Sequence, residues 1–201
     1  MTFIEDIAAL EALYGTPTEA ATAKVADRLT PGYRTWIARS RFCLLSTVGP
    51  EGTDCSPRGD DGPVVTELDP RMLALPDWRG NDRIDSLRNI VRDPRVSLLF
   101  LVPGSNNVIR VNGRARVSAD ADLCARFARQ GKVPRTVVVI EIAEVYAQCA
   151  RAPLRARLWT SGDESRDLPS MGDLLREMTE GGFDGATYDA EWPGRAARTM
   201  W

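Results

Sequence analysis

The chain of 201 residues contains no histidine. Without an imidazole, a Ser-His-Asp or Cys-His nucleophile system cannot be built. A zinc or non-haem iron site with histidine ligands is excluded for the same reason. Any acid–base chemistry must therefore use carboxylates, Tyr, Cys, Lys or a bound cofactor.

Cysteine is scarce as well, and none of the four cysteines stands in a C-x-x-C pair. This spacing excludes a zinc ribbon and a thioredoxin-type motif. We expect Cys43, Cys55, Cys124 and Cys149 to be reduced thiols of a cytoplasmic protein. A catalytic cysteine is the alternative, although such thiols usually depend on a nearby base.

Long apolar runs and a strong net charge are missing too. No window approaches the roughly 18 apolar residues of a membrane span, and the N-terminus lacks the basic region of a signal peptide. The formal net charge is −2, so no global field favours nucleic acid or a membrane surface. With 43% hydrophobic residues, the chain can still bury a substantial core.

The apolar periodicity predicts a mainly β protein with α additions (α+β). Helical spacing is found in residues 3–14, 16–30 and 33–40, which we interpret as an N-terminal helical cap over residues 1–40. A run of short strands and tight turns follows and predicts a closed or nearly closed antiparallel barrel over residues 41–148. The expected strands of this barrel are 42–47, 53–56, 64–67, 71–75, 96–102, 108–117 and 136–142. The expected helices are 84–91 and a helix of about two turns that residues 118–122 cap and that runs through Arg129.

Residues 149–201 are more polar and are interpreted as an arm over the barrel or over a partner subunit. Short helices are expected at 153–160 and 171–179, followed by an irregular glycine-rich tail that ends at Trp201. Within the arm, Arg155 and Trp159 are four residues apart and would share a helix face. An Arg beside an aromatic ring suits a planar anionic ligand, or alternatively a cation–π contact that holds the arm to the barrel.

The segment 80–83 (GNDR) lies between a predicted strand and a predicted helix. A helix N-terminus offers unpaired N–H groups and a partial positive charge. Asn81 and Arg83 would add donors that suit phosphate oxygens. The alternative is ordinary N-capping by Asn81, Asp82 or Asp85, with Arg83 in solvent.

Two further arginine positions are candidates for an anion site. In segment 56–60 (SPRGD), a proline and a glycine flank Arg58, which predicts a tight turn; the alternative is a surface ion pair with Asp60 or Asp61. Arg110 begins a stripe of polar residues on one face of a predicted strand. It is the member expected to reach a ligand, and the remaining members are Asn112, Arg114 and Arg116.

These motifs together resemble the pyridoxamine 5′-phosphate oxidase-like family of FMN-binding split barrels, and most closely a subgroup of FMN-dependent enzymes. Each motif is short, but their order and spacing between about residues 40 and 160 are specific. The matching segments are 56–60 (SPRGD), 75–77 (LPD), 80–83 (GNDR), 89–90 (NI), 93–100 (DPRVSLLF), 111–115 (VNGRA) and 149–159.

The resemblance implies a six-stranded antiparallel split β-barrel that forms a homodimer with FMN at the subunit interface. It implies that the FMN phosphate is bound by Arg58, Asn81 and Arg83, with Ser86 as a further donor. The main chain of Leu75, Pro76 and Asp77 would run along the isoalloxazine ring, and Arg110 would offer the ring a polar group. Arg155 and Trp159 would reach the flavin of the opposite subunit.

The chain also departs from the family's oxidases. They carry an Arg-x-x-x-Leu-Lys phosphate motif where this chain has RGDDGP at 58–63, with no lysine. They hold pyridoxamine phosphate with a histidine and an arginine, and this chain has no histidine. Trp78 stands where the subgroup has an arginine. Classical oxidation of pyridoxamine phosphate is therefore not expected.

The leading hypothesis is a cytoplasmic FMN-dependent oxidoreductase whose flavin carries the electrons. A small-molecule donor or acceptor such as NAD(P)H is expected, and no nucleic-acid or membrane partner is. No metal and no catalytic side chain is assigned. The alternatives are a non-catalytic flavin- or haem-binding store or sensor, and a reductase that uses the deazaflavin cofactor F420.

Overall fold

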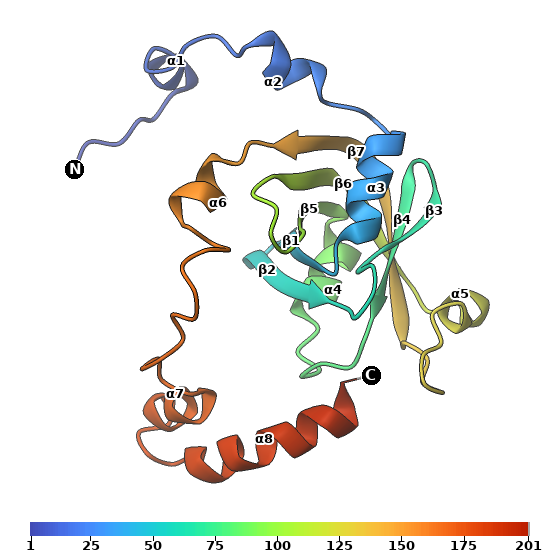
Figure 1. Cartoon of the computed structure of the whole chain (residues 1–201), viewed down its shortest axis with the longest axis vertical. Coiled ribbons are helices and arrows are strands. Elements are labelled where there is room, and N and C mark those ends of the chain that lie inside the picture. The colour runs from blue at the N-terminus through green and yellow to red at the C-terminus, as the bar shows by residue number, and fades with distance from the viewer. Residues whose placement is uncertain (201) are drawn as a thin grey trace.

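The computed structural model describes residues 1–200 and contains one antiparallel sheet of seven strands, with helices at both ends of the chain (Figure 1). The sheet curls into a split barrel, which confirms the predicted α+β barrel class. Its seven strands equal in number the seven predicted from the periodicity and exceed by one the six that the resemblance implies. The strand order is β2-β1-β5-β6-β7-β4-β3. The strands are β1 (Phe42–Gly49), β2 (Gly52–Gly59), β3 (Thr66–Asp69), β4 (Met72–Asp77), β5 (Arg95–Leu101), β6 (Val108–Ser118) and β7 (Thr136–Gln148).

The barrel core forms because apolar residues alternate along the strands. In β1, Cys43 and Leu45 are fully buried while their neighbours are partly or fully exposed. The same alternation occurs in β5, where Leu98 and Phe100 point inward. Burying a side chain of this size contributes about 1.5–3 kcal/mol, so the strands are stabilised chiefly by this shared interior.

The predicted turn at 56–60 is wrong for most of its length. Residues 56–59 belong to β2 and pair with β1, Ser56 opposite Leu45 and Gly59 opposite Phe42. Pro57 is tolerated because β2 is an edge strand, where a missing N–H can face away from the ladder. The chain leaves the strand only after Gly59.

Three helices lie close to the barrel: α3 (Pro31–Arg39), α4 (Asp85–Arg92) and α5 (Ala121–Ala125). Thr30 caps α3 by accepting a hydrogen bond from the Tyr33 N–H at 3.4 Å, and Ile37 is buried. Helix α4 packs against β1 and buries Ile90. Helix α5 ends earlier than predicted, and the N–H groups of Phe127 and Ala128 bond to carbonyl oxygens only three residues back.

The N-terminal helices are shorter than predicted: α1 (Ile7–Glu11) and α2 (Glu19–Ala23). Every residue from 1 to 23 is exposed, so neither helix is stabilised by packing on the barrel. Short helices without packing are marginal in water. Apolar side chains therefore face solvent along this segment, among them Phe3, Ile7 and Leu13.

The C-terminal arm contains α6 (Arg151–Arg155), α7 (Met171–Met178) and α8 (Gly185–Thr199). The predicted irregular tail is wrong, because residues 185–199 form a helix whose N-terminus is capped by Asp184. A Cβ on Gly172 or on Gly185 would lie 2.2 Å from the carbonyl oxygen of the other. The two glycines thus allow α7 and α8 to touch. Trp201 lies outside the described residues.

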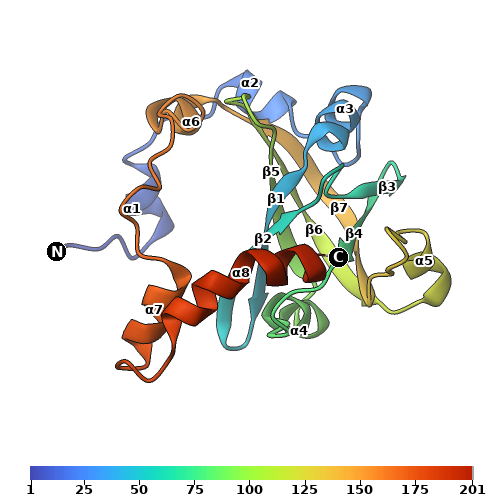
Figure 2. The same cartoon turned by 60° about the horizontal axis from the view of Figure 1, so that its bottom comes forward.

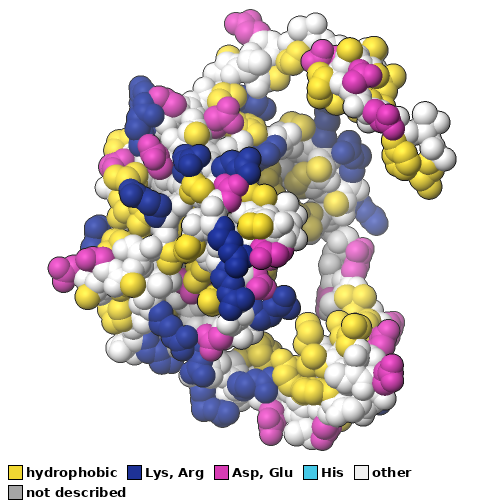
Figure 3. Space-filling model, turned by 180° about the vertical axis from the view of Figure 1, so that it is seen from behind, with side chains coloured by type: hydrophobic (Ala, Val, Ile, Leu, Met, Phe, Trp, Pro, Cys, Tyr) yellow, Lys and Arg dark blue, Asp and Glu magenta, His cyan; other side chains and the backbone are white. Residues whose placement is uncertain are grey.

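The two terminal segments curve away from the barrel on one side, and α8 returns so that its end lies beside the barrel (Figure 2), where Lys132 Nζ donates to the Arg198 carbonyl oxygen at 3.3 Å. The space-filling view from behind shows an opening between the barrel and the α7–α8 hairpin, bordered by hydrophobic side chains of the hairpin (Figure 3). Met171 and Met178 of α7 and Trp192 of α8 are exposed. No helix within residues 1–200 is long and apolar enough to cross a membrane.

Candidate functional site

The junction between β4 and α4 is the candidate site, and its backbone is unusual. Ile84 occupies the N-cap position of α4 with φ 53°, and no side chain caps this helix. A β-branched residue in the left-handed region is rare and costs about 1–3 kcal/mol. The predicted capping by Asn81, Asp82 or Asp85 is therefore wrong, and the first N–H groups of α4 have no side-chain acceptor.

The inward-facing row of β2 is polar, unlike the apolar row of β1. Asp54, Ser56 and Arg58 are half-buried, and the residues between them are exposed. Arg58 forms an ion pair with Asp77 at the end of β4, with Nη1 and Oδ1 2.7 Å apart. Its Nε is buried without a hydrogen-bond partner. The expected pairing of Arg58 with Asp60 or Asp61 is not what the structure shows.

Asp60 and Asp61 instead contact Arg129, which follows α5. The Asp60 side chain is nearly buried and also accepts a hydrogen bond from the Trp78 indole N–H at 3.1 Å. Trp78, which replaces an expected arginine, thus ties the segment after β4 to the end of β2. Sequence reasoning missed this cluster, since nothing local to Arg129 indicates an acidic partner.

Ser86 lies in the first turn of α4 and is 4% exposed. Its hydroxyl donates a hydrogen bond to Asp54 Oδ2 at 2.5 Å, so α4 is attached to the polar row of β2. One turn further on, the Asn89 amide donates to Thr47 Oγ1 at 3.1 Å. These two hydrogen bonds fix the start of α4 relative to the barrel.

Asn81 and Arg83 lie on the exposed segment that leads into α4. The Asn81 side-chain oxygen accepts the Arg83 N–H at 3.1 Å, and the Arg83 guanidinium pairs with Asp85 at 2.9 Å. The Arg83 side chain is 76% exposed. An exposed pair of this kind contributes at most about 1 kcal/mol, so a stronger anionic ligand could take the guanidinium. Leu75 and Pro76, just before this segment, are buried in β4.

Arg110, another predicted site residue, lies on β6 and not at the β4–α4 junction. Arg110 faces outward from β6, its guanidinium 5.3 Å from the centre of the Tyr146 ring. It borders a hollow of about 290 Å³ with Leu44, Ser97 and Gln148. Beside this hollow, Ser97 Oγ donates to Asn112 Oδ1, and the Asn112 amide donates to Glu144.

Trp159 attaches the arm to the barrel. Its indole N–H donates to the Ser105 carbonyl oxygen, in the β5–β6 loop, at 2.7 Å. Arg155, at the end of α6, is exposed. Helix α6 lies at one side of the barrel and α4 at the other in Figure 2. Within one chain, the residues at the β4–α4 junction are therefore separated from Arg155 and Trp159.

The four cysteines differ sharply in their surroundings. Cys43 and Cys124 are buried, whereas Cys55 and Cys149 are exposed. Burial raises the pKa of the Cys43 thiol to about 12. A hydrogen bond from the backbone N–H of Arg151 lowers the pKa of Cys149, and the charges of Arg151 and Lys24 act in the same direction.

We expect thiol titration with Ellman's reagent to separate these classes, because the thiolate is the reactive species. In the native protein, Cys149 should react fastest, Cys55 should follow, and Cys43 and Cys124 should react only after unfolding in denaturant. The Cys149→Ser variant should lose the fastest phase and retain the rest. Native-state labelling of Cys43 at the rate of Cys55 would contradict the burial described here.

The sequence of the barrel region identifies the family of the chain. A model of the pyridoxamine 5′-phosphate oxidase family matches residues 29–149, which include all seven strands. The chain belongs to this family. The arm segments before residue 29 and after residue 149 lie outside the match.

The chain is also similar to solved structures. A single-residue variant of HupZ from Group A Streptococcus is 14% identical with a TM-score of 0.50, covering 59% of this chain and 98% of its own. A Lactobacillus delbrueckii protein named for pyridoxamine 5′-phosphate oxidase is 25% identical with a TM-score of 0.49, covering 60% and 95%. An F420 reductase is 17% identical with a TM-score of 0.43, covering 58% and 98%. No curated protein is significantly similar to the chain.

Proposed function

We propose that this member of the pyridoxamine 5′-phosphate oxidase family is an FMN-dependent oxidoreductase. The flavin phosphate would bind where β4 ends and α4 begins. The observation that carries the proposal is the pair of donors at this junction: the first turn of α4, which no side chain caps, and the Nε of Arg58, which is buried without a partner. A buried donor normally has an acceptor, and a bound oxyanion would supply one.

The phosphate end of the site would be built from α4 and the segment before it. A helix N-terminus attracts an anion through its free N–H groups and its dipole. Arg83 is exposed and held only by a surface ion pair, so its guanidinium can turn to the phosphate. Asn81 lies two residues earlier and would add an amide donor.

The ring end would lie along the end of β4. Leu75 and Pro76 are buried and apolar, and Asp77 keeps Arg58 in place through their ion pair. Because Leu75 and Pro76 are buried and apolar, this part of β4 would exclude water from one face of a bound ring. The bound flavin would supply the electron-transfer chemistry. The protein's own residues would bind the cofactor and orient it.

A second copy of the chain would complete the site. In one chain, Arg155 and Trp159 lie away from the β4–α4 junction, so they would act on the flavin of the partner. The exposed apolar residues of α1 and of the α7–α8 hairpin support such a partner, because large apolar patches usually mark interaction surfaces. We therefore propose a homodimer in which the arm of each chain packs against the partner chain.

Oxidation of pyridoxamine phosphate is not part of the proposal. The chain lacks histidine, and its second strand ends in a segment, 58–63, without lysine. The lysine position of the family's phosphate motif is therefore not filled by an equivalent charge. The substrate is instead expected to be a small redox-active molecule, with NAD(P)H as the candidate electron donor.

The test is purification followed by absorption spectroscopy and mass spectrometry of the released cofactor. We expect a yellow protein whose chromophore survives dialysis and has the mass of FMN. It should be reduced by NAD(P)H in the presence of a quinone or nitro acceptor. If the released cofactor has the mass of F420 or of haem, that cofactor takes the place of FMN in the proposal. If the protein binds flavin that is never reduced, the protein is a flavin store and not an enzyme. A colourless protein that cannot be reconstituted with FMN would overturn it.

A further inference from the structure

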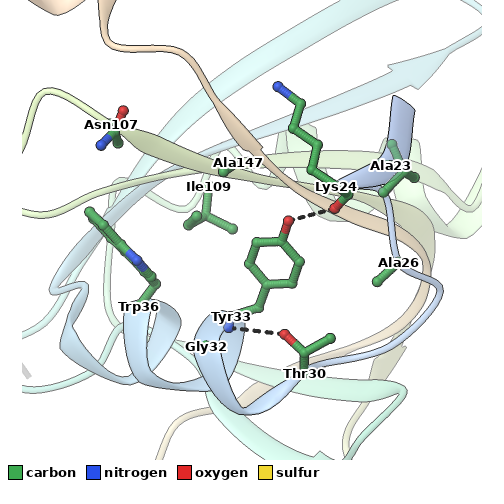
Figure 4. A pocket seen from close by; sticks show the side chains of 11 residues that line it. Ala23, Lys24, Ala26, Thr30, Gly32, Tyr33, Trp36, Asn107, Ile109 and Ala147 are labelled. Atoms are coloured by element: carbon green, nitrogen blue, oxygen red, sulfur yellow. Dashed lines mark hydrogen bonds between the residues drawn. The ribbon is translucent and has the colours of Figure 1, made fainter. Parts of the chain in front are cut away.

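A second pocket lies on the other side of the barrel from α4. It has a volume of about 550 Å³ and opens between α3, the chain before it, and the ends of β6 and β7. Figure 4 shows Tyr33 and Trp36 rising from α3 toward Ile109 and Ala147 on the sheet, with Lys24 and Asn107 across the opening. Pockets of this size accommodate small organic molecules.

The walls of this pocket are aromatic and apolar. Tyr33 and Trp36 are partly buried against the barrel core, and Ile109 is 1% exposed at its floor. The Tyr33 hydroxyl donates to the Lys24 carbonyl oxygen at 2.5 Å, which holds the phenol ring upright. Two fixed aromatic side chains on one helix, three residues apart, form a surface suited to a flat ring.

The rim of the pocket is positively charged. Lys24 is one of only two lysines in the sequence, the other being Lys132. No carboxylate among residues 1–200 forms an ion pair with Lys24. Its ammonium also lowers the pKa of Cys149, which places the positive charge near the end of β7. The Lys24 side chain extends away from the Tyr33 ring at the mouth of the pocket (Figure 4), and a cation without an acidic partner on this rim favours a ligand of opposite charge.

We infer that this pocket binds a flat aromatic anion, with Trp36 and Tyr33 against the ring and Lys24 against its carboxylate or sulfonate. Asn107 stands on the same rim and can donate an amide hydrogen bond to the same group. The ammonium of a lysine is a compact point charge on a flexible stem, so it can follow a carboxylate in several positions. The inference does not depend on flavin binding, since the two sites share no residue.

The test uses a matched pair of probes, 2-naphthoate and its neutral amide, 2-naphthamide, titrated into the purified full-length protein by calorimetry. We expect one naphthoate per chain and weaker binding of the amide. Lys24→Gln should weaken naphthoate binding roughly three- to fivefold, the scale of an accessible ion pair, and leave the amide unaffected. Trp36→Leu should weaken both probes by roughly tenfold. Lys132→Gln is the matched control and should change neither titration.

A second measurement locates the bound probe independently of affinity. Because the chain has only two lysines, acylation can be followed at both sites by mass spectrometry of one digest. Naphthoate should slow acylation of Lys24 and leave Lys132 unchanged. Circular dichroism of each variant reports whether it is folded, and Trp36→Phe replaces Trp36→Leu if the latter unfolds. Equal naphthoate affinity for the wild type and Lys24→Gln, or no protection of Lys24, would overturn the inference.

Discussion

Replacing Gly113 by alanine should lower the stability of the barrel by about 3 kcal/mol, the upper end for an overpacked site. For a chain of this length, that corresponds to a fall in Tm of roughly 6–12 °C. A Cβ at this position would lie 2.0 Å from the carbonyl oxygen of Glu141 on β7. No real contact is that short, so a strand must move.

The movement is costly because Glu141 is held on both sides. It pairs with Arg114 on β6 and with Met72 on β4, so β7 cannot retreat from one neighbour without disturbing the other. The β6–β7 register also shifts between Asn112 and Gly113. Glycine at this bulge allows the two backbones to approach closely.

The matched control is Gly15→Ala, since a Cβ there meets nothing within 4 Å. Thermal unfolding followed by circular dichroism should give the same Tm for Gly15→Ala and the wild type. If Gly113→Ala also unfolded at the wild-type temperature, the close approach of β6 and β7 described here would be incorrect.

The strands of the barrel could be predicted because their pattern is local. Alternation of apolar and polar side chains identified β1, β5 and β6 nearly to their ends. Strand β7 was predicted only to residue 142, yet it continues to Gln148. The exposed Glu144 interrupts the apolar run, and only the register with β6 shows that the strand persists.

Two wrongly predicted segments, the turn at 56–60 and the C-terminal tail, share one cause. In both, glycine and proline were interpreted by their local conformational preferences alone. Pro57 and Gly59 suggested a turn, but an edge strand tolerates both. The glycines of the C-terminal segment suggested an irregular tail, but α8 includes Gly185 and even Pro193. Gly185 is needed for contact with α7, and such a tertiary contact cannot be inferred from the neighbouring sequence.

The candidate site, like the fold, could be predicted only in part. The resemblance to a family indicated which residues belong to the β4–α4 junction, and the structure places Arg58, Asp77 and Ser86 on the elements that meet there. Their actual partners were not predictable, because Arg58 pairs 19 residues away and Ser86 pairs 32 residues away. Such contacts depend on the barrel closing β2 against β4 and α4.

Replacing Arg83 by alanine should weaken FMN binding by about 1.5–3 kcal/mol, the scale of a charged hydrogen bond. This corresponds to roughly a 10- to 150-fold rise in Kd. Arg83 is exposed and pairs only with Asp85, so its removal leaves no buried group unsatisfied and the barrel should stay folded. The measurement is a fluorescence titration of FMN into apoprotein, with Tm as the check on folding.

Arg92→Ala is the matched control, because Arg92 lies at the opposite end of the same helix and pairs with Glu51 on the surface. Like Arg83→Ala it removes one positive charge, and it should leave the FMN titration unchanged. Arg83→Lys should restore only part of the affinity, since an ammonium cannot offer the two parallel donors of a guanidinium. If Arg83→Ala titrates like the wild type, the phosphate does not bind at the start of α4. If Arg83→Ala and Arg92→Ala weaken binding equally, the flavin responds only to net charge, and the β4–α4 junction loses its assigned role.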